Sequence, residues 1–214
     1  AWAGLSALRN LRGIVITMPH KGRVAALLDE VGPTGQLVGA VNAARREPDG
    51  RWTGDMFDGV GFVDGLRDQG HEPTGWNVRI LGLGGAGAAI AIALAQSGVA
   101  SISLHDSDVS KRDELGRQLQ AAYPEVRIDA AAQTGEAFDA VVNATPLGMK
   151  VTDPLPFDPA DLPESTLVVD VITKPEVTPL LQRALDTGHR VHAGKHMHLG
   201  QARRVAQFFG YELS

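Results

Sequence analysis

Leu81-Gly82-Leu83-Gly84-Gly85-Ala86-Gly87 decides the fold of this chain, because it is a G-x-G-x-x-G sequence between two apolar runs. The run 78–81 is short, partly β-branched and, apart from Arg79, apolar, as a buried strand is. Residues 86–95 consist wholly of Ala, Ile, Leu and Gly, which is typical of a helix packed against a sheet. Strand, tight turn and helix in this order predict a dinucleotide-binding unit of the Rossmann type.

We expect the glycines of this loop to have separate roles. Gly82 allows the turn, Gly84 lets a pyrophosphate approach the backbone, and Gly87 lets helix and strand pack closely. The helix N-terminus offers unpaired N–H groups to the phosphates. The predicted cofactor-binding residues of the loop are Gly82, Gly84, Gly85, Ala86 and Gly87. An ordinary glycine-rich turn is the alternative, and the second strand that follows argues against it.

That second strand, residues 101–105, ends at Asp106, close to the roughly twenty residues past the glycines at which a ribose ligand is expected. A carboxylate there accepts hydrogen bonds from the ribose hydroxyls and repels a 2′-phosphate. A second acid, Asp108, follows, and no Arg occurs before Arg112. We therefore predict NAD as the cofactor, with NADP disfavoured. For Ser107 and Asp108 the competing interpretation is a cap on the helix that begins at residue 109.

Composition excludes several other classes of protein. The 214 residues are 43% hydrophobic and 21% charged, as in a soluble globular protein. The net charge is −5 and the basic residues are scattered, so nucleic acid is not an expected partner. No run of 18 uninterrupted apolar residues exists, so no membrane span is predicted. The absence of Cys excludes disulfides and thiolate chemistry and fits a cytoplasmic protein.

The order of elements predicts an α/β protein with two domains. Strands alternate with helices after residue 75, which implies a parallel sheet. The breaker segment 70–75 suggests the boundary, so we expect a small α/β substrate-binding domain over 1–72, a Rossmann domain over 73–194, and a C-terminal helix within 195–214 that returns to the first domain. The Pro-rich segment 152–159 is expected as a loop over the site.

Individual elements can be placed as well. Before the boundary we expect helices at 2–10, 22–30 and 57–69, a strand at 13–17, and a hairpin of 39–45 and 50–54 around Glu47-Pro48-Asp49-Gly50. After it we expect strands at 78–81, 101–105, 126–128, 140–143, 167–172 and 190–193, and helices at 86–98, 109–122, 176–187 and 197–209.

Six further strings carry a resemblance. They are VITMPHK (15–21), GAVNA (39–43), GDMFDGVG (54–61), NATPLGM (143–149), DVITKPEVTPLL (170–181) and GKHMHLGQA (194–202). In order and separation they resemble the shikimate dehydrogenase family, over essentially the whole chain. The resemblance implies a nicotinamide-dependent oxidoreductase that acts on a small cyclic hydroxy acid, as a monomer or a homodimer.

Oxidation of a secondary alcohol needs a hydride acceptor and a group that takes the hydroxyl proton. Lys21 follows a strand end and the rigid Pro19, and the resemblance makes Lys21 and Asp58 the catalytic pair and Asn42 a ligand of a substrate hydroxyl. The alternative is that Lys21 caps its strand on the surface and that Asp58 is the N-cap of a helix.

The resemblance implies further site residues. Thr17 and Gln201 match substrate ligands, although Gln201 can also be a solvated helix residue. The matched cofactor residues are Asn143, Thr145, Val171, Gly194 and Met197, of which Met197 can equally be a core residue. The alternating His192, His196 and His198 lack an acidic partner and a firm ligand spacing, so no metal site is predicted.

Departures from the family leave the substrate open. Met56-Phe57-Asp58 stands where the family has Asn-Thr-Asp, Asn42-Ala43 where it has Asn-Thr, and Thr173 where it has Tyr. We expect Phe57 to narrow the pocket, so shikimate, quinate, an amino-shikimate or another cyclic hydroxy acid all fit. The family's opening strand and helix, with a Ser-x-Ser pair, have no counterpart, so we expect the natural protein to be longer.

Two other functions are alternatives to this one. Methylenetetrahydrofolate dehydrogenases share a catalytic lysine and a Rossmann half, but residues 39–42 and 197–201 argue against them. A cofactor-sensing homologue without turnover is the second alternative, and the joint presence of Lys21, Asp58 and Asn42 argues against it.

Overall fold

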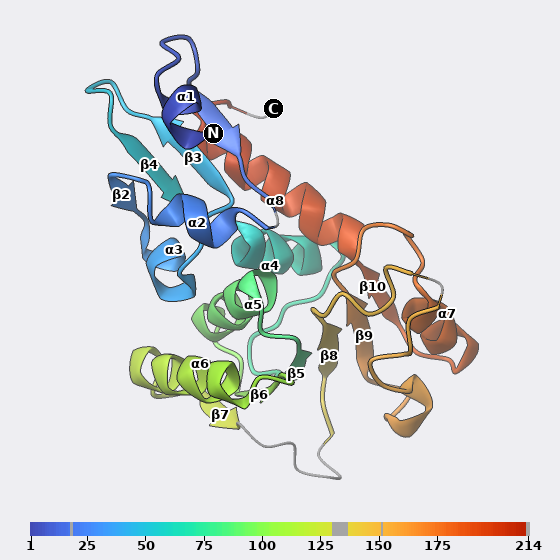
Figure 1. Ribbon diagram of the computed structural model, residues 1–214. Helices are drawn as coiled ribbons and strands as arrows, with labels where there is room; N and C mark the ends of the chain where they lie inside the picture. The colour runs from blue at the N-terminus through green and yellow to red at the C-terminus, as the bar shows by residue number, and fades with distance from the viewer. Residues whose placement is uncertain (18, 130–136, 151, 213–214) are drawn as a thin grey trace.

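The computed structural model describes residues 1–17, 19–129, 137–150 and 152–212. It consists of a four-stranded sheet near the N-terminus and a six-stranded sheet, with helices α4, α5 and α8 between them (Figure 1). The predicted α/β class is therefore confirmed. Among the described residues, no helix combines the length and the apolar character that a bilayer crossing requires.

The small sheet has the strand order β1-β3-β4-β2. Its β3 (Ala43–Arg46) and β4 (Trp52–Asp55) form the predicted antiparallel hairpin, and the turn between them is closed by the N–H of Glu47 on Arg51 O at 2.8 Å. β1 (Gly13–Val15) pairs antiparallel with β3, whereas β2 (Glu30–Val31) pairs parallel with β4. Three short helices accompany it: α1 (Trp2–Ser6), α2 (Lys21–Ala25) and α3 (Pro33–Val38).

The prediction was least accurate in this half. The expected helix 2–10 ends at Ser6, because α1 has no side-chain cap and buries no residue that would stabilise a longer helix. The expected helix 22–30 is only α2, and β2 and α3 were missed. A two-residue strand has no periodicity to detect. For α3 a signal existed: Pro33 at its start and Gly39, with φ of +67°, at its end.

The large sheet is parallel throughout and has the order β10-β9-β8-β5-β6-β7. From β7 inward this is the Rossmann order, with the switch point between β5 and β8. Its elements are β5 (Asn77–Leu81), α5 (Gly85–Gln96), β6 (Ser101–His105), α6 (Val109–Ala122), β7 (Arg127–Asp129), β8 (Ala140–Asn143), the 3₁₀ turn η1 (Pro159–Asp161), β9 (Leu167–Asp170), α7 (Pro179–Asp186) and β10 (Val191–Ala193).

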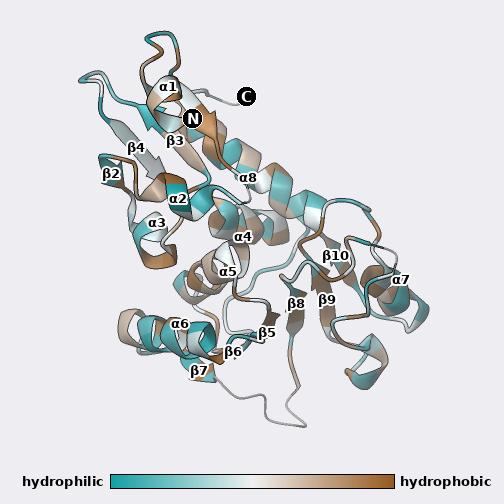
Figure 2. Ribbon diagram, viewed as in Figure 1, coloured by the Kyte–Doolittle hydropathy of each residue, from teal (hydrophilic) through white to brown (hydrophobic). Residues whose placement is uncertain are grey.

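The central strands β8 and β9 are mainly hydrophobic, whereas α6 and α7 carry both hydrophobic and hydrophilic residues (Figure 2). This pattern fits a sheet that is covered on both faces. β9 ends two residues earlier than expected and α7 begins three residues later. The start of α7 is set by Thr178, whose hydroxyl caps the helix by accepting the N–H of Leu181 at 3.3 Å, and by Pro179 in the first helical position.

Helix α4 (Asp58–Asp68) and helix α8 (Gly194–Phe208) join the two halves. α8 leaves the edge of the large sheet and runs along α4 to the small sheet (Figure 1), where Arg45 donates to Phe208 O at 2.6 Å. A Cβ at Gly61 would overlap the backbone of Gln201, so the two helices approach closely at this level. This close contact sets the position of Gln201 relative to Asp58.

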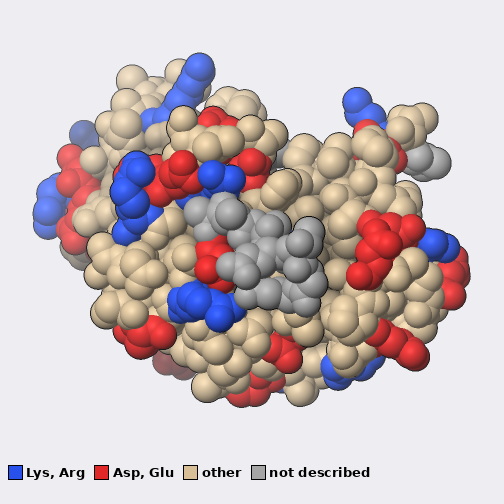
Figure 3. Space-filling model, turned by 90° about the horizontal axis from the view of Figure 1, so that it is seen from below, with Lys and Arg blue, Asp and Glu red and all other residues tan. Residues whose placement is uncertain are grey.

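One face of the molecule carries charges of both signs side by side (Figure 3). Blue and red groups alternate there, and neither sign forms a continuous area over the part of that face drawn in colour.

Candidate active site

A cavity of about 1080 Å³ lies between the two halves of the molecule. The small-sheet half contributes the end of β1 and the starts of α2 and α4. The large-sheet half contributes the glycine loop and the carboxyl ends of its strands, which is where open α/β sheets bind ligands. The residues at its wall include Thr17, Lys21, Asp58, Gly82, Gly84, Gly85, Ala86, Asp106, Thr145, Val171, Thr173, Gly194, Met197, His198 and Gln201.

The carboxylate of Asp58 gathers three side chains from distant parts of the chain. Its Oδ2 lies 2.5 Å from Nζ of Lys21. Its Oδ1 accepts hydrogen bonds from Nδ2 of Asn42 at 2.7 Å and from Nε2 of Gln201 at 2.5 Å. The structure thus brings both predicted catalytic residues and two of the three predicted substrate ligands into one cluster, and the third, Thr17, lines the same cavity.

The competing interpretations of these residues are wrong. Asp58 is the first residue of α4 and its side chain faces the cluster, while the N-cap position is occupied by Phe57 without a side-chain cap. The Lys21 side chain is only 18% exposed and is paired with Asp58, so it is not a surface cap. Gln201 is likewise hydrogen-bonded rather than solvated.

Two residues lie elsewhere than expected. Asn42 is fully buried behind Asp58, and its Oδ1 accepts the N–H of Phe57 at 2.9 Å, so it holds Asp58 and the start of α4 instead of facing the cavity. Phe57 does not narrow the pocket, because its ring packs against Phe208 with the centroids 5.0 Å apart and it is not at the cavity wall. Thr173 does line the cavity.

The glycine loop has the geometry of a phosphate cradle. Gly82 has φ of +89°, which favours glycine, and a Cβ at Gly87 would overlap Gly82 O. At Gly84, by contrast, an added Cβ meets nothing within 4 Å, so the space beside this residue is open. α5 begins at Gly85 and lacks a side-chain cap, which leaves its first N–H groups available to an anion. The residues present therefore fit a dinucleotide pyrophosphate.

Asp106 follows β6 directly and lies next to the glycine loop, at Leu83. Its Oδ2 accepts the N–H of Leu83 at 2.6 Å and its Oδ1 that of Asp108 at 2.8 Å, which leaves lone pairs on both oxygens. Desolvation raises the pKa of Asp106, but these two N–H groups and the charge of Lys111 outweigh it, so the pKa is lowered overall. The carboxylate is thus kept ionised at the cavity wall.

The helix cap next to Asp106 is Asp108. Its side chain accepts the N–H groups of Ser110 and Lys111, so capping explains Asp108 and does not explain Asp106. Lys111 was missed by the sequence analysis, which looked only for Arg. It lines the same end of the cavity, with Nζ 3.7 Å from Oδ2 of Asp108.

Of the remaining predicted cofactor residues, Thr145, Val171, Gly194 and Met197 line the cavity. Met197 is also part of the main hydrophobic core, so it packs in the core and lines the cavity at once. Asn143 lies beneath the wall, fully buried, and its Oδ1 accepts from the Thr145 hydroxyl at 2.6 Å. Pro156 lines the cavity, so the Pro-rich segment reaches the cavity at this residue.

Three histidines meet where the two halves join. The buried ring of His192 lies between His71 and His196, at centroid distances of 6.1 and 5.0 Å. Burial, followed by the charges of His196 and His71, lowers the pKa of His192 to about 4. Within the described part of the chain, no group of three His, Cys, Asp or Glu is arranged to hold a metal ion.

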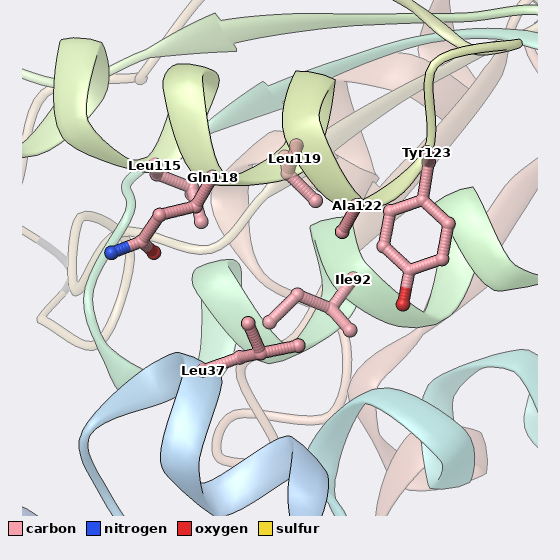
Figure 4. Close-up of a pocket in the computed structure, with 7 residues that line it drawn as sticks. All are labelled: Leu37, Ile92, Leu115, Gln118, Leu119, Ala122 and Tyr123. Atoms are coloured by element: carbon pink, nitrogen blue, oxygen red, sulfur yellow. The ribbon is translucent and has the colours of Figure 1, made fainter.

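A shallow hollow with no room for a water molecule lies between α3, α5 and α6 (Figure 4). Its wall is formed almost wholly by apolar side chains, with Leu37 of α3 facing Ile92 of α5 and Leu119 of α6. Gln118 is its polar exception, and none of the lining residues is charged. This hollow lies where the helices of the two halves pack together, and its lining residues include no group that could transfer a proton or bind a phosphate.

The fold and the cavity together define a two-sheet α/β protein with a Rossmann-type cofactor site. Comparison with known proteins agrees. Residues 1–44 match the family model described as the shikimate dehydrogenase substrate binding domain. A shikimate dehydrogenase (NADP(+)) of Rhodospirillum rubrum is 36% identical over 214 aligned residues, which cover 95% of this chain and 74% of that protein. This chain therefore belongs to the shikimate dehydrogenase family of NAD(P)-dependent oxidoreductases.

Solved structures of related enzymes superpose on nearly the whole chain. The quinate dehydrogenase from Corynebacterium glutamicum in complex with NAD is 32% identical, with a TM-score of 0.84 over 98% of this chain and 76% of that one. The 5-ketofructose reductase of Gluconobacter sp. strain CHM43 is 30% identical, with a TM-score of 0.86 over 99% and 78%. The chain spans 66 to 74% of the length of the curated relatives it matches.

Proposed function

We propose that this protein is a dehydrogenase of the shikimate and quinate type, which oxidises a ring hydroxyl of a cyclic hydroxy acid, or reduces the corresponding ketone. The observation that carries the proposal is the 2.5 Å pair of Lys21 and Asp58 at the wall of a cavity whose opposite wall is the glycine loop. A proton-transfer group and a cofactor cradle face one space, as this reaction needs.

The bound nicotinamide supplies the hydride acceptor. The neutral amine form of Lys21 takes the proton from the substrate hydroxyl at Nζ, and Oδ2 of Asp58 stabilises the ammonium that this transfer forms. Asn42 and Gln201 fix the other oxygen of Asp58, so the carboxylate cannot rotate away from Lys21. The free Oε1 of Gln201 and the hydroxyl of Thr17 are the groups we assign to the other polar groups of the substrate.

We further propose NAD as the preferred cofactor. The support is Asp106, an ionised carboxylate at the ribose end of the loop, which accepts from a 2′-hydroxyl and repels a 2′-phosphate. The curated relative named above carries NADP(+) in its name, and the Corynebacterium enzyme was solved with NAD. Lys111 is the residue at this end that favours the phosphate, so the balance of Asp106 and Lys111 decides the preference.

The test is formation of NADH with shikimate, quinate and their amino analogues as separate substrates. For Lys21→Ala we expect kcat on the best substrate to fall by about 10²–10⁴. Binding of NADH, followed by its fluorescence, is expected to stay unchanged, because Lys21 belongs to the opposite wall. Lys150→Ala removes an exposed lysine outside the cavity wall and is the matched control.

Three results would count against this function. Full activity in Lys21→Ala contradicts the proton-transfer role. NADH binding without turnover of any hydroxy acid indicates a cofactor-sensing homologue. Turnover of methylenetetrahydrofolate in place of the hydroxy acids indicates the other lysine-dependent dehydrogenase class.

A further inference from the structure

A buried carboxylate that the proposed reaction does not use lies beneath the cofactor side of the cavity. Asp170 is the last residue of β9 and is fully buried. Its Oδ1 accepts the N–H of Ile172 at 3.0 Å and Nδ2 of Asn143 at 3.2 Å. Its Oδ2 accepts the hydroxyl of Thr178 at 2.7 Å. All three of these donors are neutral.

Stability alone does not explain this carboxylate. Burial raises the pKa of Asp170, and the hydrogen bonds from Thr178, Ile172 and Asn143 only partly offset that effect. A buried carboxylate without a cation partner is costly, and an apolar residue in a well-packed site is usually as stable or more so. Within the described residues, no basic side chain forms an ion pair with Asp170. A buried group of this kind is a candidate for a functional role.

Two of the three hydrogen bonds hold the two ends of one segment of the cavity wall. Ile172 is two residues after Asp170, and Thr178 is the N-cap of α7, so the carboxylate joins the start and the end of segment 171–178. Residues 171–174 of this segment all line the cavity. The loop therefore receives its shape from a side chain that does not itself reach the cavity.

Asn143 extends the same network to the neighbouring strand. It is the register partner of Asp170 on β8. Its Oδ1 accepts from the backbone N–H and the hydroxyl of Thr145 at 3.1 and 2.6 Å, and its Nδ2 also donates to Leu147 O at 3.0 Å. Thr145 and Leu147 line the cavity as well. Asp170 and Asn143 thus tie two wall segments to each other.

We propose that Asp170 is a positioning residue for the dinucleotide: it holds residues 171–174 and, through Asn143, Thr145 in a preformed wall against which the cofactor binds. This inference rests on the proposed function, because it assumes that the cavity binds a nicotinamide cofactor. It differs from a structural role in that loss of the carboxylate weakens cofactor binding more than it weakens the fold.

Three variants test it. Asp170→Ala removes the acceptor of all three hydrogen bonds, and of the three donors only Nδ2 of Asn143 keeps another acceptor, Leu147 O. Asp170→Asn keeps one oxygen that accepts from Ile172 and Asn143. Its NH₂ group stands where Oδ2 was and donates to the Thr178 hydroxyl, which then accepts this hydrogen bond where it donated before. Thr166→Val is the matched control, because Thr166 is equally buried and donates to Phe138 O at 2.8 Å at the other end of β9.

We expect Asp170→Ala to raise the Kd of NADH about tenfold or more, with kcat at saturating cofactor and substrate within about threefold of the parent. Amide hydrogen exchange over 171–178 in the cofactor-free protein is expected to accelerate. Asp170→Asn is expected to restore most of the affinity. Thr166→Val lowers the melting temperature without a change in Kd.

An unchanged Kd in folded Asp170→Ala overturns the inference, and so does an equal rise in Thr166→Val. Should Asp170→Ala fail to fold, Thr178→Val replaces it, because this variant keeps the carboxylate and removes the donor to its Oδ2 together with the cap of α7. A Kd equal to that of the parent then overturns the inference. A parent chain that binds no NADH refutes the proposed function instead. Hydrogen exchange still decides the positioning role in that case, since unchanged rates over 171–178 contradict it.

Discussion

The two walls of the cavity are built in opposite ways. The cofactor wall depends on the backbone of consecutive residues, in which Gly82 turns the chain, Gly84 leaves open space and α5 begins at Gly85. The opposite wall depends on side chains from four separate segments that meet at Asp58. A site made of local backbone is specified by the sequence around it, whereas a site made of distant side chains exists only when the whole molecule is folded.

The comparison also shows what each wall is sensitive to. The loop is sensitive to a single methyl group at two of its glycines, because Gly82 and Gly87 lie against other backbone atoms. The polar cluster is sensitive to the packing of α4 against α8, because this contact brings Gln201 to Asp58. Variants that act on one wall without the other are therefore the direct way to test the distinction.

The largest effect is expected from Gly87→Ala. The new Cβ would overlap Gly82 O, and neither backbone segment can move without opening the loop, so we expect a loss of about 3 kcal/mol in the free energy of unfolding. Urea denaturation followed by circular dichroism measures it. Gly84→Ala is the matched control: its φ of −68° suits Ala and its Cβ meets nothing, so stability stays within about 0.5 kcal/mol while NADH binding weakens.

These two variants test whether Gly84 and Gly87 have different roles. Equal stability losses in Gly84→Ala and Gly87→Ala would mean that the two glycines do not differ in role. Unchanged NADH binding in Gly84→Ala would mean that the open space beside it is not the phosphate site.

The junction between the two walls carries an intermediate effect that depends on pH. The pKa of His192 is about 4 in the folded protein, below its ordinary value of 6.5, so the folded ring stays neutral while the unfolded chain takes up a proton as the pH falls. Above pH 6.5 this contribution to stability is complete. Between pH 6.5 and 4 it is lost, by up to roughly 3 kcal/mol at the lower limit.

The measurement is the free energy of unfolding of the parent and of His192→Phe between pH 7 and 4. We expect the parent to lose more stability than the variant over this range. The carboxylates affect both proteins equally, and only the parent has the buried imidazole at position 192. His20→Gln, which removes an exposed histidine, is expected to follow the parent. Parallel curves for the parent and His192→Phe would contradict the assignment.

The smallest effect concerns cofactor choice at the ribose end of the loop. For Asp106→Ser we expect the ratio of kcat/KM with NAD to that with NADP to fall about 10- to 100-fold, because the carboxylate no longer repels the 2′-phosphate and Lys111 remains. Glu114→Ala is the control: it removes an exposed acid of α6 that pairs with Arg117 outside the cavity wall, and it leaves this ratio unchanged. A parent enzyme that prefers NADP would refute the NAD proposal outright.

The Rossmann half could be predicted from the sequence because its signals are local. The glycine spacing, the apolar run before it and the strand that ends at Asp106 all lie within 30 consecutive residues, and the strand and helix alternation after them needs no long-range information. The small-sheet half was predicted less well. β2 has only two residues and is a strand only because β4 lies beside it.

The sequence by itself determined the α/β class, the glycine loop, the family and the identity of Lys21, Asp58 and Gln201 as candidates. The tertiary structure alone decided how they are used. It buried Asn42 behind Asp58, turned Phe57 towards Phe208, and placed Asp170 beneath two wall segments. Local patterns report backbone periodicity and turns, whereas the direction and the partners of a side chain depend on contacts between segments far apart in the chain, which no local pattern contains.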